Sequence, residues 1–274
     1  MRRVLVMGIV NVTPDSFSDG GRHEGLEAAL SHSRRLLGEG ADILDIGGES
    51  TRPGAAPVPL DEEIRRTAPL IRALRAETDA PISIDTMKPE VAQAAIEAGA
   101  TIWNDVSALG FSKSSPAIAA ELGCEVILMH MRGEPGTMQD APYYQDVGRE
   151  VRDHLLARME AATSAGVRAE RIWLDPGIGF GKRMLEHNLP LLRDLEALVA
   201  LGPRVLLGAS RKSFIGALDR NAPASERLGG SIAAALRGAQ AGVRAVRVHD
   251  VRPTVQALAV WEATQAGSKE EEAQ

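Results

Sequence analysis

Eight short apolar runs alternate along this 274-residue chain with longer stretches of helical periodicity, and this alternation limits the fold more than any other feature. The runs begin roughly 20 to 45 residues apart, which is the spacing of consecutive strand–helix units. No Ser/Gly-rich linker or low-complexity block separates the units, so the pattern predicts one α/β domain. The runs are residues 4–10, 43–46, 82–84, 101–103, 126–129, 172–174, 205–207 and 243–248.

Stretches with the periodicity of amphipathic helices lie between these runs. Several of them pass into the next strand through a glycine, as the C-terminus of a helix prefers. The predicted helices are residues 25–37, 61–77, 89–98, 115–122, 147–165, 188–199, 223–241 and 254–266.

Two architectures are compatible with repeated strand–helix units, an open doubly wound sheet and a closed (β/α)8 barrel. Eight units within about 250 residues is the usual size of the barrel. Only 3% of the residues are aromatic, so the core must be built mainly from Leu, Ile, Val and Ala. Such a core suits buried parallel strands covered by helices. We predict a single-domain TIM barrel over residues 1–267, followed by a disordered charged tail at residues 268–274.

Polar residues follow almost every apolar run. In a parallel barrel the C-terminal ends of all strands share one face, so side chains far apart in the sequence converge there on one site. A single polar strand end is usually a cap or a turn residue, but such a succession favours a functional face. These residues are Asn11, Asp45, Glu49, Asp85, Asn104, Asp105, His130, Asp175, Ser210, Lys212, Arg247 and His249.

Charge and cysteine content exclude several classes of protein. The formal net charge of −6 argues against broad nucleic-acid binding, which needs a basic footprint. Cys124 is the only cysteine, so no internal disulfide can form. No apolar segment approaches the roughly 20 residues that span a bilayer, and the first run is too short for a signal peptide. We therefore expect a cytoplasmic protein that partners neither nucleic acid nor membrane.

Two long loops follow the first two runs. Residues 11–21 exceed the usual length of about 2–6 residues for such a loop, and they offer oxygen ligands for a hard cation with Phe17 as an aromatic wall. The second loop carries Arg52 between glycines and prolines, where its guanidinium could bind a phosphate or a carboxylate. A solvated turn and an exposed surface arginine are the alternatives.

Residues 172–174 form an apolar run that ends in Asp175, and Pro176 then stops the strand. Glycines follow at positions 177, 179 and 181, where they let backbone N–H groups approach a flat or anionic ligand. This stretch predicts the floor of a pocket, or else an ordinary loop with a capping aspartate. Its spacing fits neither the dinucleotide fingerprint nor the P-loop.

Asp85, Asn104 and Asp175 at strand ends could exchange hydrogen bonds with a heterocycle. Paired carboxylates could instead carry out acid–base chemistry or hold a metal. On the last two units, Arg247 and His249 alternate onto one side, and with Lys212 they predict an anion receiver. The remaining histidines, His23, His32, His154 and His187, fall in predicted helices and are expected at the surface.

The chain resembles the dihydropteroate synthases from residue 7 to residue 250, through every unit in order. The motifs that carry the resemblance are MGIVNVTPDSFSDGG, ADILDIGGESTRPGA, ISIDT, IWNDVSAL, ILMHMRGEPGTMQ, LDPGIGFGK, GASRKSFIG and RVHDV. The resemblance implies a TIM-barrel enzyme of folate biosynthesis. Such an enzyme condenses 6-hydroxymethyl-7,8-dihydropterin diphosphate with p-aminobenzoate, giving 7,8-dihydropteroate and pyrophosphate.

The resemblance also implies site residues, Mg2+ as cofactor and a homodimer. Asp85, Asp175, Lys212 and Arg52 would be catalytic. The pterin would contact Asp85, Asn104, Met129, Asp175, Phe180, Gly208 and Lys212. The diphosphate would contact Asn11, Thr51, Arg52, Arg247 and His249, with Asn11 also binding Mg2+. Phe17, Pro53 and Ser213 would border the p-aminobenzoate channel. The two lines of reasoning disagree on Lys212. Barrel geometry assigns it to an anion, whereas the family resemblance assigns it to the pterin, and we follow the family.

Two other functions use a similar pocket. A methyltransferase barrel that binds methyltetrahydrofolate shares the carboxylates but has no use for Arg52, Arg247 and His249 together. A non-catalytic pterin-binding protein would be expected to lack loop residues such as Asn11, Asp15 or Arg52, and all three are present.

Overall fold

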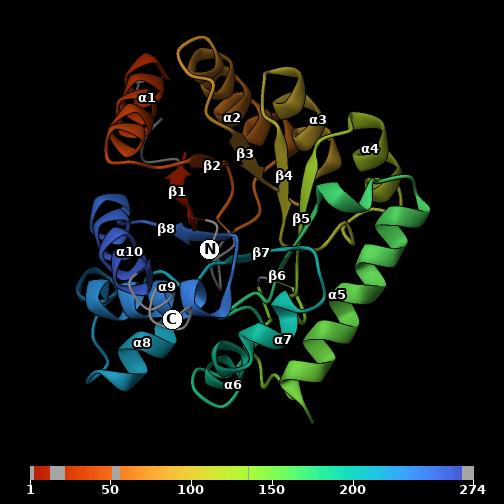
Figure 1. Ribbon diagram of the computed structural model, residues 1–274. Coiled ribbons are helices and arrows are strands. Elements are labelled where there is room, and N and C mark those ends of the chain that lie inside the picture. The colour runs from red at the N-terminus through yellow and green to blue at the C-terminus, as the bar shows by residue number, and fades with distance from the viewer. Residues whose placement is uncertain (1–2, 13–21, 51–55, 135, 267–274) are drawn as a thin grey trace.

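A computed structural model describes residues 3–12, 22–50, 56–134 and 136–266, and eight parallel strands close into a barrel within them (Figure 1). Each strand begins and ends within two residues of its predicted run, which confirms the TIM barrel. The strands are β1 Leu5–Asn11, β2 Ile43–Gly47, β3 Ile82–Asp85, β4 Ile102–Asp105, β5 Glu125–Met129, β6 Ile172–Asp175, β7 Arg204–Leu207 and β8 Ala245–Val248.

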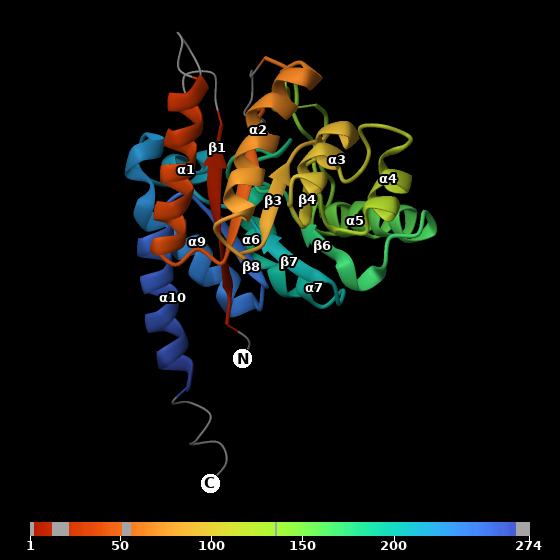
Figure 2. The ribbon, with the colours of Figure 1, turned by 90° about the horizontal axis from the view of Figure 1, so that it is seen from above.

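Helices surround the barrel (Figure 1). They are α1 Arg22–Gly38, α2 Leu60–Arg75, α3 Pro89–Glu97, α4 Ser115–Leu122, α5 Val147–Ser164, α6 Asn188–Arg193, α7 Leu195–Val199, α8 Ser213–Leu218, α9 Leu228–Ala241 and α10 Val251–Ala266. Along β1, both α1 and α10 pack against the strand (Figure 2). No helix among the described residues is long and apolar enough to cross a membrane. The predicted tail, residues 268–274, and its boundary at residue 267 lie outside the described residues.

Two predicted helices differ from the structure. The helix expected at residues 188–199 is interrupted at Asp194, whose backbone (φ −102°, ψ 23°) leaves the helical region and separates α6 from α7. The helix expected from residue 223 begins as a 3-10 turn at Ala224–Glu226, and α9 starts only at Leu228. The six-residue helix α8 has no counterpart among the predicted ranges.

The interior of the barrel is filled by one apolar side chain from each of seven strands. All seven are buried and form a cluster separate from the larger core between strands and helices. On the one remaining strand, β3, Ser83 is fully buried as well. Because bulky residues fill this layer, the barrel is a packed core and not a pore. The seven residues are Met7, Ile43, Ile102, Ile127, Trp173, Leu206 and Ala245.

The residues two positions further along each strand determine where a site can form. Side chains alternate along a strand, so these residues project to the same side as the interior layer but one step nearer the C-terminal face. The strand register places Asn11 beside Gly47, Gly47 beside Asp85, and Asp85 beside Asn104. The set that follows the interior layer is Ile9, Asp45, Asp85, Asn104, Met129, Asp175, Gly208 and Arg247.

The prediction that the helix histidines lie at the surface is wrong for His154 and His187. His187 is buried and its ring packs edge-on against Tyr144, with 4.8 Å between centroids. His154 is half-buried and packs in the same manner against the ring of His130. Helical spacing alone did not reveal that α5 and the chain before α6 enclose the loop after β5.

Candidate active site

Four side chains from four strands meet at the C-terminal end of the barrel. The guanidinium of Arg247 on β8 donates to Asp45 on β2 at 2.6 Å and to Asp85 on β3 at 2.7 Å. The amide of Asn104 on β4 lies 3.3 Å from Asp45 Oδ2. Asp45, which sequence reasoning noted at a strand end but did not assign to the site, therefore links the predicted pterin and diphosphate residues. The signal that could have identified Asp45 is its position on β2, two residues beyond the interior residue Ile43.

Asp85 presents an unused acceptor. Its Oδ2 accepts from Arg247, whereas its Oδ1 is buried and has no hydrogen-bond partner among the described residues. Burial raises the pKa of Asp85 to about 7; Arg247 opposes this shift, and the neighbouring Asp45 adds to it. A buried carboxylate oxygen without a donor is costly, and a ligand N–H would satisfy it.

Arg247 stays charged in this environment. Burial works against its charged form, but Asp45 and Asp85 together more than offset that effect and raise the pKa above the usual value. Its side chain remains 21% exposed. The guanidinium therefore reaches from the carboxylates toward solvent, and its five N–H donors allow contact with a further anion.

The loop after β6 lies against the loop after β5. Gly177 has φ +64°, and a Cβ at this position would lie 2.0 Å from the carbonyl oxygen of His130. Only glycine fits such a conformation and such a close approach. The Gly177 N–H donates to Asp175 Oδ1 at 2.7 Å, which fixes the carboxylate over the barrel. Burial raises the pKa of Asp175 to about 6, opposed by this hydrogen bond and by Lys212 and Arg247.

Lys212 comes from the loop after β7 and approaches the same place. Its ammonium lies 4.1 Å from the centre of the Phe180 ring, a cation–π contact, and it is close enough to Asp175 to affect its pKa. A methyl group at Gly208 would lie no nearer than 3.6 Å to Asp175 Oδ2, so the protein itself does not require glycine there. Glycine instead leaves room beside the carboxylate. Met129, paired with Asp175 in the sheet, is buried.

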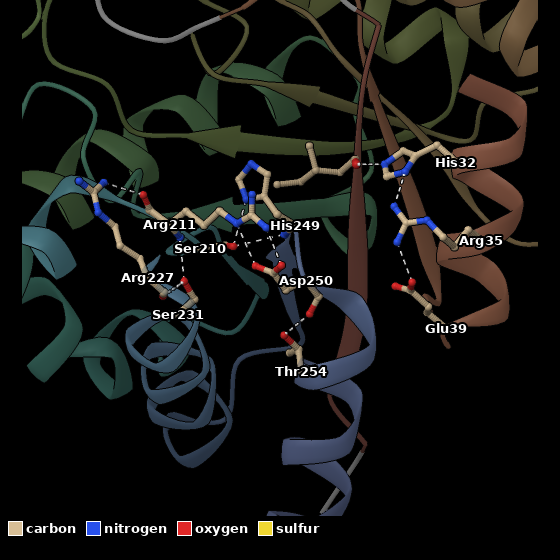
Figure 3. A network of polar contacts seen from close by, with 11 residues as sticks. His32, Arg35, Glu39, Ser210, Arg211, Arg227, Ser231, His249, Asp250 and Thr254 are labelled. Atoms are coloured by element: carbon tan, nitrogen blue, oxygen red, sulfur yellow. Dashed lines mark hydrogen bonds and ion pairs between the residues drawn. The ribbon is translucent and has the colours of Figure 1, made fainter. Parts of the chain in front are cut away.

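His249 and Ser210 lie at the ends of β8 and β7 (Figure 3). Ser210 Oγ lies 3.0 Å from His249 Nδ1 and accepts from the backbone N–H of His249 at 3.2 Å. His249 is two residues beyond Arg247, so both basic groups follow the same strand toward the C-terminal face. Asn11 is exposed at the end of β1, and Ser213 is exposed at the start of α8. Phe17, Thr51, Arg52 and Pro53 lie outside the described residues.

Not every polar strand end joins this cluster. Asp105 is buried and accepts hydrogen bonds from Ser107 and Leu109 in its own turn. Glu49 pairs with Lys88 at the start of α3. The prediction of convergence is therefore wrong for these two, which stabilise loops. It is also wrong for His130, whose buried ring packs against Tyr144 and His154.

Sequence reasoning missed Lys182, the last residue of the glycine-rich stretch. It is only 1% exposed, and its ammonium donates to the carbonyls of Gly177 at 2.9 Å and Phe180 at 3.0 Å. It also lies 2.9 Å from Nδ1 of His130. Burial lowers the pKa of Lys182 well below its usual value. This lysine ties the loops after β5 and β6 together, and nothing in its spacing indicated burial.

A resident metal would need a cluster of protein ligands. Within the described ranges, no group of three His, Cys, Asp or Glu side chains could hold a metal ion. Mg2+ commonly keeps only one or two protein ligands and takes the rest from substrate phosphates and water. Asn11 is exposed and carries an amide oxygen, so it fits a site of that kind.

Comparison with known proteins gives a consistent result. The family described as "Pterin binding enzyme" matches residues 7–249. The dihydropteroate synthase of Escherichia coli strain K12 is 48% identical over 259 residues, which cover 94% of this chain and 91% of that protein. The dihydropteroate synthase of Neisseria meningitidis serogroup B is 49% identical over 263 residues, covering 94% and 92%.

Solved structures agree with the sequence relatives. Dihydropteroate synthase of Xanthomonas albilineans with 4-aminobenzoic acid matches with a TM-score of 0.90 and 52% identity, covering 96% of this chain and 94% of that one. A structure from the same organism in complex with 7,8-dihydropteroate matches with a TM-score of 0.86 and 49% identity, over the same shares of the two chains.

Proposed function

This chain belongs to the dihydropteroate synthases, and on that premise we propose which of its residues carry out the reaction. The enzyme is a transferase that joins a pterin to p-aminobenzoate to give 7,8-dihydropteroate. We propose that the pterin substrate is the 6-hydroxymethyl-7,8-dihydropterin diphosphate and that pyrophosphate leaves.

The pterin would lie against the carboxylates at the end of the barrel. The observation that carries this assignment is Asp85 Oδ1, a buried acceptor without a partner among the described residues. A pterin presents N–H groups and carbonyl and ring acceptors along one edge, so it could donate to Asp85 and Asp175 and accept from Lys212 or Asn104. Met129 and Phe180 would pack beside the ring, and Gly208 would leave space for it.

The diphosphate would lie nearer the mouth, at Arg247 and His249. Arg247 on β8 contacts Asp85, and His249 lies two residues further along the chain toward the C-terminal face. The partial exposure of the Arg247 side chain supports this placement. Thr51 and Arg52 are assigned to the diphosphate from the family resemblance. Asn11, which lies beside Gly47 in the register and is separated by it from Asp85, would contact the diphosphate and its Mg2+.

The proposed chemistry follows from the placing of carboxylates against the pterin and of basic side chains against the diphosphate. The C–O bond between the pterin methylene and the diphosphate breaks first, and its electron pair leaves with the pyrophosphate. Asp85 in its ionised form stabilises the positive charge that remains on the pterin, while Arg247 and His249 stabilise the departing anion. The neutral aromatic amine then forms the C–N bond and loses its proton, so no strong general base is needed.

Mg2+ bound to the diphosphate would neutralise the charge that develops on the leaving group. The p-aminobenzoate would approach past Phe17, Pro53 and Ser213. Cys124 is a free, buried thiol, which suits a reducing compartment, and we propose a cytoplasmic location. A homodimer is proposed from the resemblance alone, and sedimentation of the purified protein tests it.

Pyrophosphate release from the purified protein tests the proposed function. With pterin diphosphate, p-aminobenzoate and Mg2+ all present, one pyrophosphate should be released for each dihydropteroate formed. Omitting Mg2+ should reduce the rate sharply. No release under any of these conditions would contradict the synthase and leave a pterin-binding protein.

A further inference from the structure

The loops that follow β7 and β8 are joined by one bidentate ion pair. Arg211 Nε donates to Asp250 Oδ2 at 2.9 Å, and its Nη2 donates to Oδ1 at 2.5 Å (Figure 3). Arg211 lies between Ser210 and Lys212, and Asp250 directly follows His249. The pair therefore connects the two segments that carry the proposed diphosphate and pterin residues.

Arg211 is held in an unfavourable backbone conformation. Its φ of +57° lies in the left-handed region, which residues other than glycine rarely adopt. Its backbone N–H donates to Ser231 Oγ at 2.9 Å, and its carbonyl accepts from Arg227 at 3.0 Å. Such a conformation persists only where the surroundings fix it, and here both backbone groups and the side chain are bound.

This turn sends its two flanking side chains to different parts of the site. Lys212 reaches Phe180 and Asp175, whereas Ser210 reaches the ring of His249. The Ser210 hydroxyl accepts from the His249 backbone N–H and lies 3.0 Å from Nδ1 of the ring, so these two contacts orient the imidazole. When Ser210 donates to Nδ1, Nε2 of the neutral ring carries the hydrogen and can donate to an anion.

We infer that Arg211 and Asp250 are positioning residues for pyrophosphate departure. Their ion pair, called the latch below, holds Ser210, His249 and Lys212 in the geometry that the reaction needs. The inference rests on the proposed function of His249 and Lys212. The half-exposed guanidinium of Arg211 could instead contact the diphosphate directly. In that case Asp250 would be dispensable, which gives the two roles different mutational signatures.

A double-mutant cycle separates these roles, with the affinity for inorganic pyrophosphate and kcat/KM for pterin diphosphate as readouts. Arg211→Gln and Asp250→Asn should each lower both by about 10-fold, as loss of an orienting partner does. The double variant should lose no more than either single variant, because both changes break the same latch. Arg34→Gln, which breaks an exposed bidentate pair with Glu77, is the matched control and should change neither readout.

The variant Arg211→Gly tests whether misfolding, rather than loss of the ion pair, explains a 10-fold loss. Glycine accepts the left-handed conformation, so this variant should unfold at or above the wild-type temperature and still show the 10-fold loss. Wild-type behaviour of Asp250→Asn, or additive losses in the double variant, would overturn the latch. Failure of the wild-type protein itself to release pyrophosphate would instead overturn the proposed function, and the latch with it.

Discussion

The guanidinium of Arg247 lies 2.7 Å from the carboxylate of Asp85, so a predicted diphosphate residue and a predicted pterin residue are in direct contact. Arg247 also binds Asp45, which makes one buried cation shared by two carboxylates. An arriving diphosphate would compete for this guanidinium and weaken its hold on Asp85. Binding of the anion would therefore leave Asp85 better able to stabilise positive charge on the pterin.

Replacement of Lys212 tests the pterin assignment. Lys212→Met should weaken binding of a pterin without a diphosphate by roughly 10- to 100-fold, the usual loss for a charged hydrogen bond. Titration calorimetry measures this directly. Lys113→Met, at an exposed position after β4, is the control and should bind normally. If Lys212→Met weakened only pyrophosphate binding, the barrel-based assignment of Lys212 to the anion would be the correct one.

Lys182 is expected to stabilise the pocket floor. Lys182→Met would leave the buried carbonyls of Gly177 and Phe180 without their donor, so the free energy of unfolding should fall by about 3 kcal/mol. Denaturant unfolding measures the change. The neighbouring exposed pair of Arg183 and Glu186 provides the control, since Arg183→Met should cost no more than about 0.5 kcal/mol. Equal stability of the two variants would show that the buried lysine contributes nothing net.

Pterin binding should depend on pH through the two buried carboxyls. Their pKa values are raised, to about 7 for Asp85 and about 6 for Asp175, so both take up protons as the pH falls through that range. Protonation removes the acceptors, and the affinity for a pterin without a diphosphate should decrease from pH 8 toward pH 5.5. In Asp85→Asn the component near pH 7 should disappear. Tighter binding at the lower pH would contradict the assignment.

Much of the fold and part of the site follow from local sequence signals. The strands were predictable because short apolar runs such as 172–174 end abruptly at Asp175 and Pro176. The strand ends of a parallel barrel share one face, which placed Asp85, Asn104 and Arg247 together. The helix break at Asp194 could not be predicted, because residues 188–199 remain apolar at helical spacing across it.

The buried polar groups were the least predictable part. Lys182 and His187 look like surface residues in the sequence, and His130 was expected at the C-terminal face with the other polar strand ends. Only the packing of the loops after β5 and β6 encloses these three side chains. The left-handed turn at Arg211 was equally hidden, since no glycine marks it. In each case the burial or the turn depends on tertiary structure, because a distant loop contributes the hydrogen-bond acceptors or donors.

Turnover of Asp85→Asn, compared with its pterin affinity, tests the central claim most directly. Asparagine keeps the shape of the side chain but removes the negative charge, so kcat should fall by about 100-fold or more while the dissociation constant rises by no more than about 10-fold. Asp79→Asn, at the exposed residue that precedes β3, is the control and should behave as wild type. Unchanged kcat in Asp85→Asn would contradict stabilisation of a pterin cation by this carboxylate.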